Sequence, residues 1–181
     1  DSQLLWSYEC SAHHDLDVDS DVNIYTLTND WIKLKQGVLV IDNALLILSP
    51  DGKLVKKISF LPLMYASKNH AVEPLLKRVV GMALAGAQDV YHTNTLQIID
   101  EKTAYPNSPI FKKNNILISI LTLSTIAIID PKLEEIVWIA GPRLWIEGQH
   151  NATLLADGNM LTFDNHYKDQ KDRSRVLEFK P

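Results

Sequence analysis

Three histidines recur at one position of a sequence repeat, and their side chains are the ones best suited to chemistry. His14, His92 and His150 each open a segment that leads into short apolar runs. An imidazole can act as a base, an acid, a nucleophile or a metal ligand near neutral pH. One such histidine would more often bond a neighbouring sheet, but recurrence in all three units favours a functional role.

The repeat also predicts how these histidines are positioned. Each is followed by an asparagine-led strand and then by a strand ending in proline, and both His14 to Asn23 and His150 to Asn159 are nine residues apart. The second unit carries an insertion over 101–113. Repeats of roughly 40 residues made of short strands are typical of β-propeller blades, which place equivalent residues around one axis. The units run over about 6–60, 88–138 and 139–181.

Most apolar runs are short, rich in Ile, Val, Leu, Tyr and Thr, and separated by turn-forming residues, which predicts an all-β fold. The spacing of apolar residues in 71–87 instead predicts a short inserted helix. Because a closed propeller needs about four to eight blades, we expect a partial ring of about three blades from a longer protein. The predicted strands cover 22–28, 44–50, 53–60, 115–120, 124–131, 135–141, 159–163 and 174–181.

Composition narrows the class of protein further. The 181 residues are 46% hydrophobic, with a net charge of -4 and no long basic run, which argues against nucleic-acid binding. The most apolar stretch, 116–130, is shorter than the roughly 20 residues of a membrane-spanning helix, so no span is expected. The chain does not open with a charged segment followed by an apolar one, so a signal peptide is either absent or outside the sequence given. Cys10 is the only cysteine, which excludes an internal disulfide, and we expect a half-buried strand residue rather than a nucleophile.

Several motifs of this chain resemble those of the bacterial arylsulfotransferase family of six-bladed β-propellers. They are WSYECSAHHDLDVDSDVNIYTLT, DVYHTNTLQIID, NILISILTLSTIAIIDP, and GQHNATLLADGNMLTFDN with SRVLEFKP, the last pair being the most specific. The resemblance implies about three to four blades of such a ring. It also implies transfer of a sulfuryl group from an aryl sulfate to a phenol, independent of a nucleotide sulfate donor, without a cofactor or metal, at a periplasmic or secreted address.

The resemblance also implies roles for individual residues. His150, in the GQH motif, would be the nucleophile that forms a sulfohistidine intermediate. His14 and His92 match family histidines that contact the sulfuryl oxygens, and Asn94 matches an asparagine that does similar work. A protonated imidazole would donate a proton to the leaving group. His13 and Trp145 are further candidate substrate contacts, although strand alternation places His13 opposite His14.

One departure from the family pattern leaves alternatives open. We expect an arginine near the position of Leu121, where its fork would hold a sulfuryl group. Arg143 or Arg175 could replace it from another strand, but each is more simply a surface residue or a salt-bridge residue between blades. A catalytically silent propeller that binds a small anion or a protein partner is the main rival. A metal site would need the three imidazoles about 2 Å from one ion. A homo-oligomer stays open.

Overall fold

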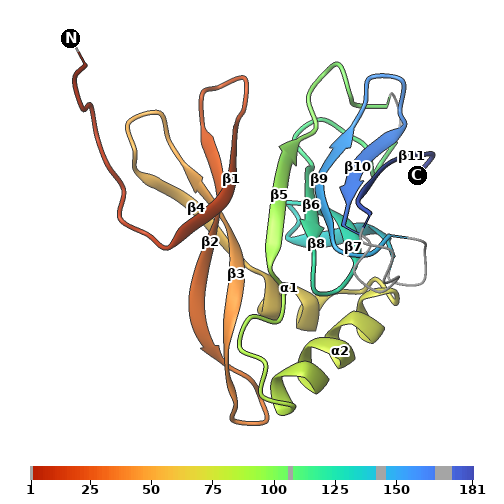
Figure 1. The fold of residues 1–181 in the computed structure, drawn as a ribbon. Helices are drawn as coiled ribbons and strands as arrows, with labels where there is room; N and C mark the ends of the chain where they lie inside the picture. Colours follow the sequence, from red (N-terminus) through yellow and green to blue (C-terminus); the bar gives the residue numbers. More distant parts are fainter. Residues whose placement is uncertain (1, 106–107, 142–145, 166–172) are drawn as a thin grey trace.

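The computed structural model describes residues 2–105, 108–141, 146–165 and 173–181, which form three antiparallel sheets (Figure 1). In each sheet, strands that follow one another in the chain are hydrogen-bonded neighbours. The first contains β1 (Ala12–Val18), β2 (Ile24–Lys33), β3 (Leu39–Leu48) and β4 (Leu54–Ser59). The second contains β5 (Thr93–Ile98), β6 (Ile116–Ile120), β7 (Thr125–Asp130) and β8 (Glu135–Ala140). The third contains β9 (Gln149–Leu154), β10 (Met160–Asp164) and β11 (Arg175–Phe179).

The second sheet lies at the centre of the hydrophobic core. All residues of β6 and β7 are buried, which explains why their sequences are apolar without alternation. Residues such as Ile118 and Ile129 face the first sheet and the helices, whereas Leu117 and Ile128 face the third sheet. The predicted β-rich character is therefore confirmed. Within the described residues no sheet closes on itself, so the sheets alone do not establish a ring.

Two helices follow the first sheet. The predicted helix over 71–87 is confirmed as α2 (Val72–Leu84), which buries Val72, Leu75, Val79 and Ala83. A second helix, α1 (Phe60–Ala66), begins where the sequence predicts the end of a strand, so that part of the prediction is wrong. No helix in the described part of the chain is long and apolar enough to cross a membrane.

The unexpected start of α1 has a tertiary cause. The buried Asp42 on β3 accepts a hydrogen bond from the Leu61 N–H at 3.0 Å, while Ser59 at the helix N-cap makes no side-chain cap bond. Pro62 is tolerated in the first turn because N–H groups there have no partner within a helix. Asp42, on β3, therefore accepts a first-turn N–H of α1, a role that a residue at the start of the helix usually has.

The residues before β1 run along the outside of the first sheet (Figure 1). Trp6 donates a hydrogen bond from Nε1 to the Pro50 carbonyl oxygen at 3.0 Å. Cys10 is exposed and lies ahead of β1, so the prediction of a half-buried strand residue is wrong. Its position explains this, because residues 9–11 are exposed and belong to no strand.

Candidate functional site

The first strands of the three sheets lie side by side and run in the same direction (Figure 1). On β1, Asp15 Oδ2 accepts from the Leu96 N–H at 2.9 Å, and Asp17 Oδ2 accepts from the Ile98 N–H at 2.8 Å. Both partners advance by two residues in the same direction, so β1 and β5 run parallel to each other. The acidic alternation of β1 serves to join the sheets.

The contact between β5 and β9 repeats this arrangement with a neutral side chain. Gln97 Oε1 accepts from the Leu154 N–H at 2.7 Å, and Gln97 Nε2 donates to the Leu154 carbonyl oxygen at 3.2 Å. Because the strands are parallel to one another, their N-terminal ends share one end of the assembly. His14, His92 and His150 all lie at or beside those ends.

The backbone is irregular where the histidines lie. His14 and His92 have φ angles of 61° and 48°, and Asn151, directly after His150, has 50°. Non-glycine residues in this left-handed region are uncommon and often mark functional sites. The pairing register shifts at the same places, between His13 and Leu16, between Thr93 and Thr95, and opposite Leu161 and Phe163. Such bulges redirect side chains, and each histidine strand contains one.

The three histidines share one electrostatic environment. The rings of His14 and His92 are in edge contact, with centroids 5.0 Å apart. Burial lowers the pKa of His14, and positive charge on His92 and then on His150 lowers it further. A protonated imidazole at one position thus disfavours protonation of the next. The ring contact thus joins His14 and His92, and His150 acts on His14 through its charge.

His13 lies in the same cluster, contrary to the strand alternation that places it opposite His14. Its Nδ1 is 2.8 Å from His14 Nδ1. The left-handed backbone at His14 breaks the alternation and turns the two rings toward each other. One nitrogen must donate and the other accept, so at least one of the two imidazoles is neutral. Burial lowers the pKa of His13, as does the charge of His14.

His92 is held through its ring and its backbone. Asp89 accepts from the His92 N–H at 2.9 Å, and its other oxygen lies 2.7 Å from His92 Nδ1. The His92 carbonyl accepts from the Leu121 N–H at 3.3 Å. Asp89 was not among the residues predicted from the sequence, although a carboxylate three residues before a histidine was a usable signal.

His150 Nδ1 lies between a hydrogen-bond acceptor, the Gly148 carbonyl oxygen, and a hydrogen-bond donor, the Asn165 side-chain amide. His150 Nδ1 lies 3.0 Å from the Gly148 carbonyl oxygen. Hydrogen on Nδ1, donated to this carbonyl, leaves a lone pair on Nε2, whereas a bond from Asn165 Nδ2 at 3.2 Å needs the lone pair on Nδ1. The Asn165 side chain donates to the same carbonyl at 3.3 Å. The form with hydrogen on Nδ1 is the one that a nucleophilic Nε2 requires.

Gln149 positions His150 and was also missed by the sequence analysis. It is fully buried, and its Nε2 lies within 3.2 Å of Ser119 Oγ and within 3.0 Å of the Ile120 and Thr125 carbonyl oxygens. Asn94, predicted as a substrate contact, donates from Nδ2 to the Gln149 carbonyl at 2.9 Å. In this structure Asn94 thus supports the strand that carries the candidate nucleophile.

The position where an arginine is expected, Leu121, and the two arginines that could replace it lie in different parts of the chain. Leu121 lies in the turn after β6, where its N–H donates to the His92 carbonyl oxygen. Arg175 on β11 pairs through Nε and Nη2 with the buried Asp164 on β10 at 3.0 and 2.9 Å. The expected ion pair is present, but it lies within the third sheet and does not join two sheets. Arg143 and Trp145 lie outside the described residues.

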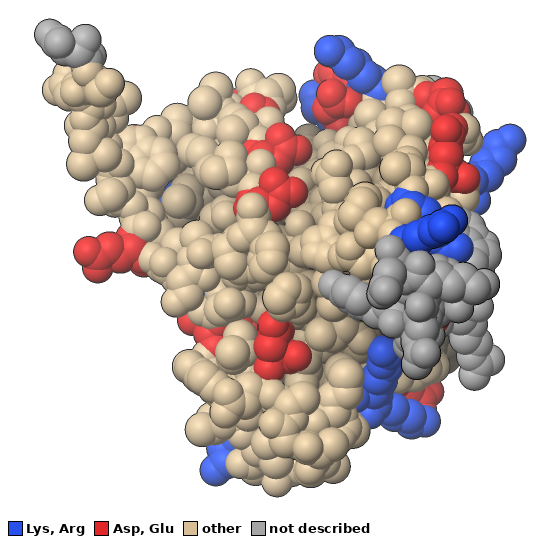
Figure 2. Space-filling model, in the orientation of Figure 1, with Lys and Arg blue, Asp and Glu red and all other residues tan. Residues whose placement is uncertain are grey.

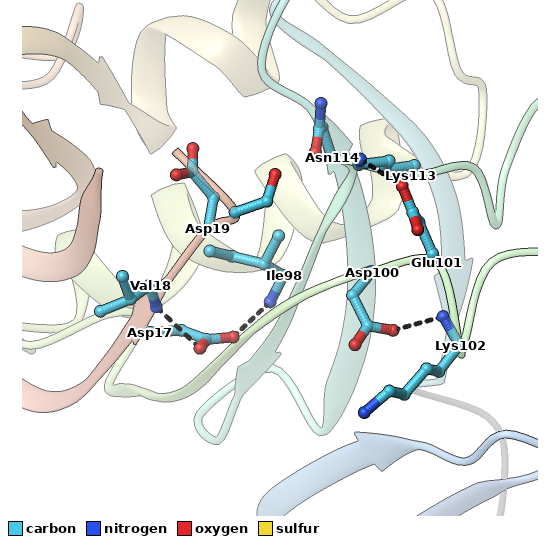
Figure 3. Close-up of a pocket in the computed structure, with 10 residues that line it drawn as sticks. Asp17, Val18, Asp19, Ile98, Asp100, Glu101, Lys102, Lys113 and Asn114 are labelled. Atoms are coloured by element: carbon cyan, nitrogen blue, oxygen red, sulfur yellow. Dashed lines mark hydrogen bonds and ion pairs between the residues drawn. The ribbon is translucent and has the colours of Figure 1, made fainter. Parts of the chain in front are cut away.

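A separate pocket of about 320 Å³ lies at the other end of β1 and β5 (Figure 3). Its carboxylates are engaged: Asp17 accepts from the Ile98 N–H, Asp100 accepts from the Lys102 N–H, and Glu101 pairs with Lys113.

Among the described residues, no group of three or more His, Cys, Asp or Glu is arranged to hold a metal ion. Figure 2 shows the lysine and arginine side chains of one face spread around its margin.

A search against models of protein families and a search of curated proteins both found no match for this chain.

Proposed function

We propose that this chain is part of a six-bladed β-propeller that transfers a sulfuryl group from an aryl sulfate to a phenol through a sulfohistidine at His150. The observation that carries the proposal is the arrangement of His14, His92 and His150 at one end of three neighbouring strands. Each uses Nδ1 for a contact with His13, Asp89 or Gly148, and no partner within the described residues occupies its Nε2.

The first half of the reaction forms the intermediate. His150 Nε2 attacks the sulfur, an N–S bond forms, and the S–O bond to the aryl oxygen breaks. A protonated imidazole of the cluster gives its proton to the departing phenolate oxygen, so the products are a phenol, a neutral imidazole and sulfated His150. Proton donation matters because a phenol leaves more readily than a free phenolate.

The second half reverses these roles with the acceptor phenol. Its oxygen attacks the sulfur as the N–S bond breaks, and the neutral imidazole takes the phenol proton. His150 returns to its starting form and no nucleotide, metal or other cofactor is consumed. Splitting one displacement into two in this way lowers each barrier. The proposed partners are therefore a small aryl sulfate and a phenol, at a periplasmic or secreted address.

The second candidate function is anion binding without catalysis. Leu121 lies beside His92, where an arginine would hold a sulfuryl group, and supplies no charge. The imidazole cluster would still attract a small anion when one of its members is protonated. Such a site would bind an aryl sulfate without releasing the phenol.

The experiment that separates the two candidates is mass spectrometry of the full-length protein after brief exposure to 4-nitrophenyl sulfate. Transfer predicts an acid-labile adduct of sulfuryl mass on the His150 peptide, discharged by added phenol. The His150→Gln variant should lose the adduct, whereas Glu73→Gln, which changes an exposed pair with Lys77 on α2, should keep it. Binding of the aryl sulfate with neither adduct nor nitrophenol release would replace transfer with anion binding.

A further inference from the structure

Asp89 contacts His92 in two ways at once. One carboxylate oxygen lies 2.7 Å from His92 Nδ1, and the other accepts the His92 backbone N–H at 2.9 Å. The second bond holds the left-handed backbone of His92, whose φ is 48°. A single side chain therefore controls both the backbone conformation and the ring of His92.

Asp89 is itself fixed against the edge of the first sheet. The Ile41 N–H on β3 donates to the Gln88 carbonyl oxygen at 2.9 Å, and Ile41 pairs with Asp89 as an isolated parallel bridge. Two residues along β3, Asn43 Oδ1 accepts the Thr93 N–H at 2.9 Å. The segment around His92 is thus bonded to β3 on both sides, which gives the carboxylate a defined position.

The charge of Asp89 reaches the neighbouring imidazoles as well. For both His13 and His14, burial lowers the pKa and the negative charge of Asp89 opposes that effect. The Asp89 carboxylate contacts the ring of His92 directly, whereas the rings of His13 and His14 are hydrogen-bonded to each other. The cluster therefore divides into a carboxylate-bound imidazole and an imidazole pair.

We propose that Asp89 is a positioning residue that holds His92 in the form with hydrogen on Nδ1 and leaves Nε2 as its reactive nitrogen. An ionised carboxylate can only accept hydrogen bonds, so its contact with Nδ1 requires a hydrogen there. With neutral imidazole this leaves the lone pair on Nε2, and with imidazolium it leaves Nε2–H as the donor. His92 can then exchange a proton only through Nε2.

The effect on rate rests on the proposed sulfuryl transfer, in which His92 is one of the imidazoles that exchange the proton. The form of the ring does not rest on it. Asp89→Asn tests both, because the asparagine amide has the same shape but presents an N–H group that favours the opposite tautomer. Comparable substitution in a His–Asp pair costs orders of magnitude in rate through the wrong tautomer.

The direct measurement is long-range ¹H–¹⁵N correlation NMR of the full-length protein at a pH where His92 is neutral. The wild-type protein should show His92 protonated on Nδ1, and Asp89→Asn should move the hydrogen to Nε2. The matched control Glu73→Gln should leave the His92 pattern unchanged. A wild-type ring with hydrogen on Nε2, or a ring unaffected by Asp89→Asn, overturns the assignment. The wild-type spectrum by itself shows which ring nitrogen of His92 carries the hydrogen, so this part of the test does not require the variant to fold.

Activity provides the second measurement. If transfer occurs, Asp89→Asn should lower kcat by about 100-fold or more, with little change in KM. Asp89→Glu should recover part of the loss, since it restores a carboxylate. An unchanged kcat in Asp89→Asn contradicts the positioning role. If the wild-type protein forms no adduct but shows the expected tautomer, the proposed transfer fails while the role of Asp89 stands.

Discussion

Asn94 Nδ2 lies 2.9 Å from the backbone carbonyl oxygen of Gln149 and ties β5 to the strand that carries His150. Both residues are buried, and Asn94 Oδ1 accepts from Thr95 Oγ1 at 3.2 Å. The orientation of the candidate nucleophile thus depends on a bond between two sheets. A residue two positions after one histidine supports another histidine far along the chain.

Asn94→Ala should weaken this connection. The Gln149 carbonyl loses a donor in a buried place, so we expect a loss of about 1–3 kcal/mol in the free energy of unfolding. Urea denaturation followed by circular dichroism measures it. Asn159→Ala is the comparison and should cost less, because the side-chain bonds that it removes, to Asp157 and Glu178, are exposed to water. Equal stability of Asn94→Ala and the wild-type protein would contradict a positioning role for Asn94.

Asp42 predicts an unusual dependence of stability on pH. Burial raises its pKa to about 7, and the hydrogen bond from Leu61 only partly opposes this. The folded protein therefore holds a proton that the unfolded chain, with an aspartate pKa near 3.9, has released, and stability falls as the pH rises from about 4 to about 7. The full effect is on the order of 4 kcal/mol.

Asp42→Asn should remove this loss. The amide oxygen can still accept the Leu61 N–H but carries no charge, so the variant should exceed the wild-type protein in stability at pH 8 and approach it at pH 4.5. Urea denaturation at several pH values measures the difference. Asp51→Asn, at an exposed turn, should follow the wild-type curve over the same range. Parallel curves for Asp42→Asn and wild type would show that Asp42 is ionised throughout.

Gly158 allows the insertion of the second unit to pack on the third sheet. A Cβ at Gly158 would lie 0.8 Å from Tyr105 Oη, and its φ is 88°. Gly158→Ala should therefore cost about 1–3 kcal/mol through strain and displacement of Tyr105. Gly81→Ala is the matched control, because a Cβ there meets nothing within 4 Å and α2 should gain about 0.5–1 kcal/mol. Thermal unfolding of both variants measures the contrast.

Leu121→Arg tests the consequence of the missing arginine. If the chain transfers sulfuryl groups, a guanidinium beside His92 should hold the sulfuryl oxygens and raise kcat/KM for 4-nitrophenyl sulfate by about 10-fold or more. The matched control is Leu121→Gln, which adds polarity without charge. A decrease in both variants would indicate that the leucine side chain, rather than a lack of charge, sets the present rate.

The sequence by itself determined the strand-rich fold, the helix over Val72–Leu84 and the three recurring histidines. These depend on local periodicity and on turn residues, which operate within a few positions of the chain. His13, Gln149 and α1 required the tertiary structure. A bulge turns His13 toward His14, Gln149 bonds residues from two distant strands, and Asp42 supplies the bond at the start of α1. Partners of this kind are set by how separate sheets pack, and a local pattern contains no information about that packing.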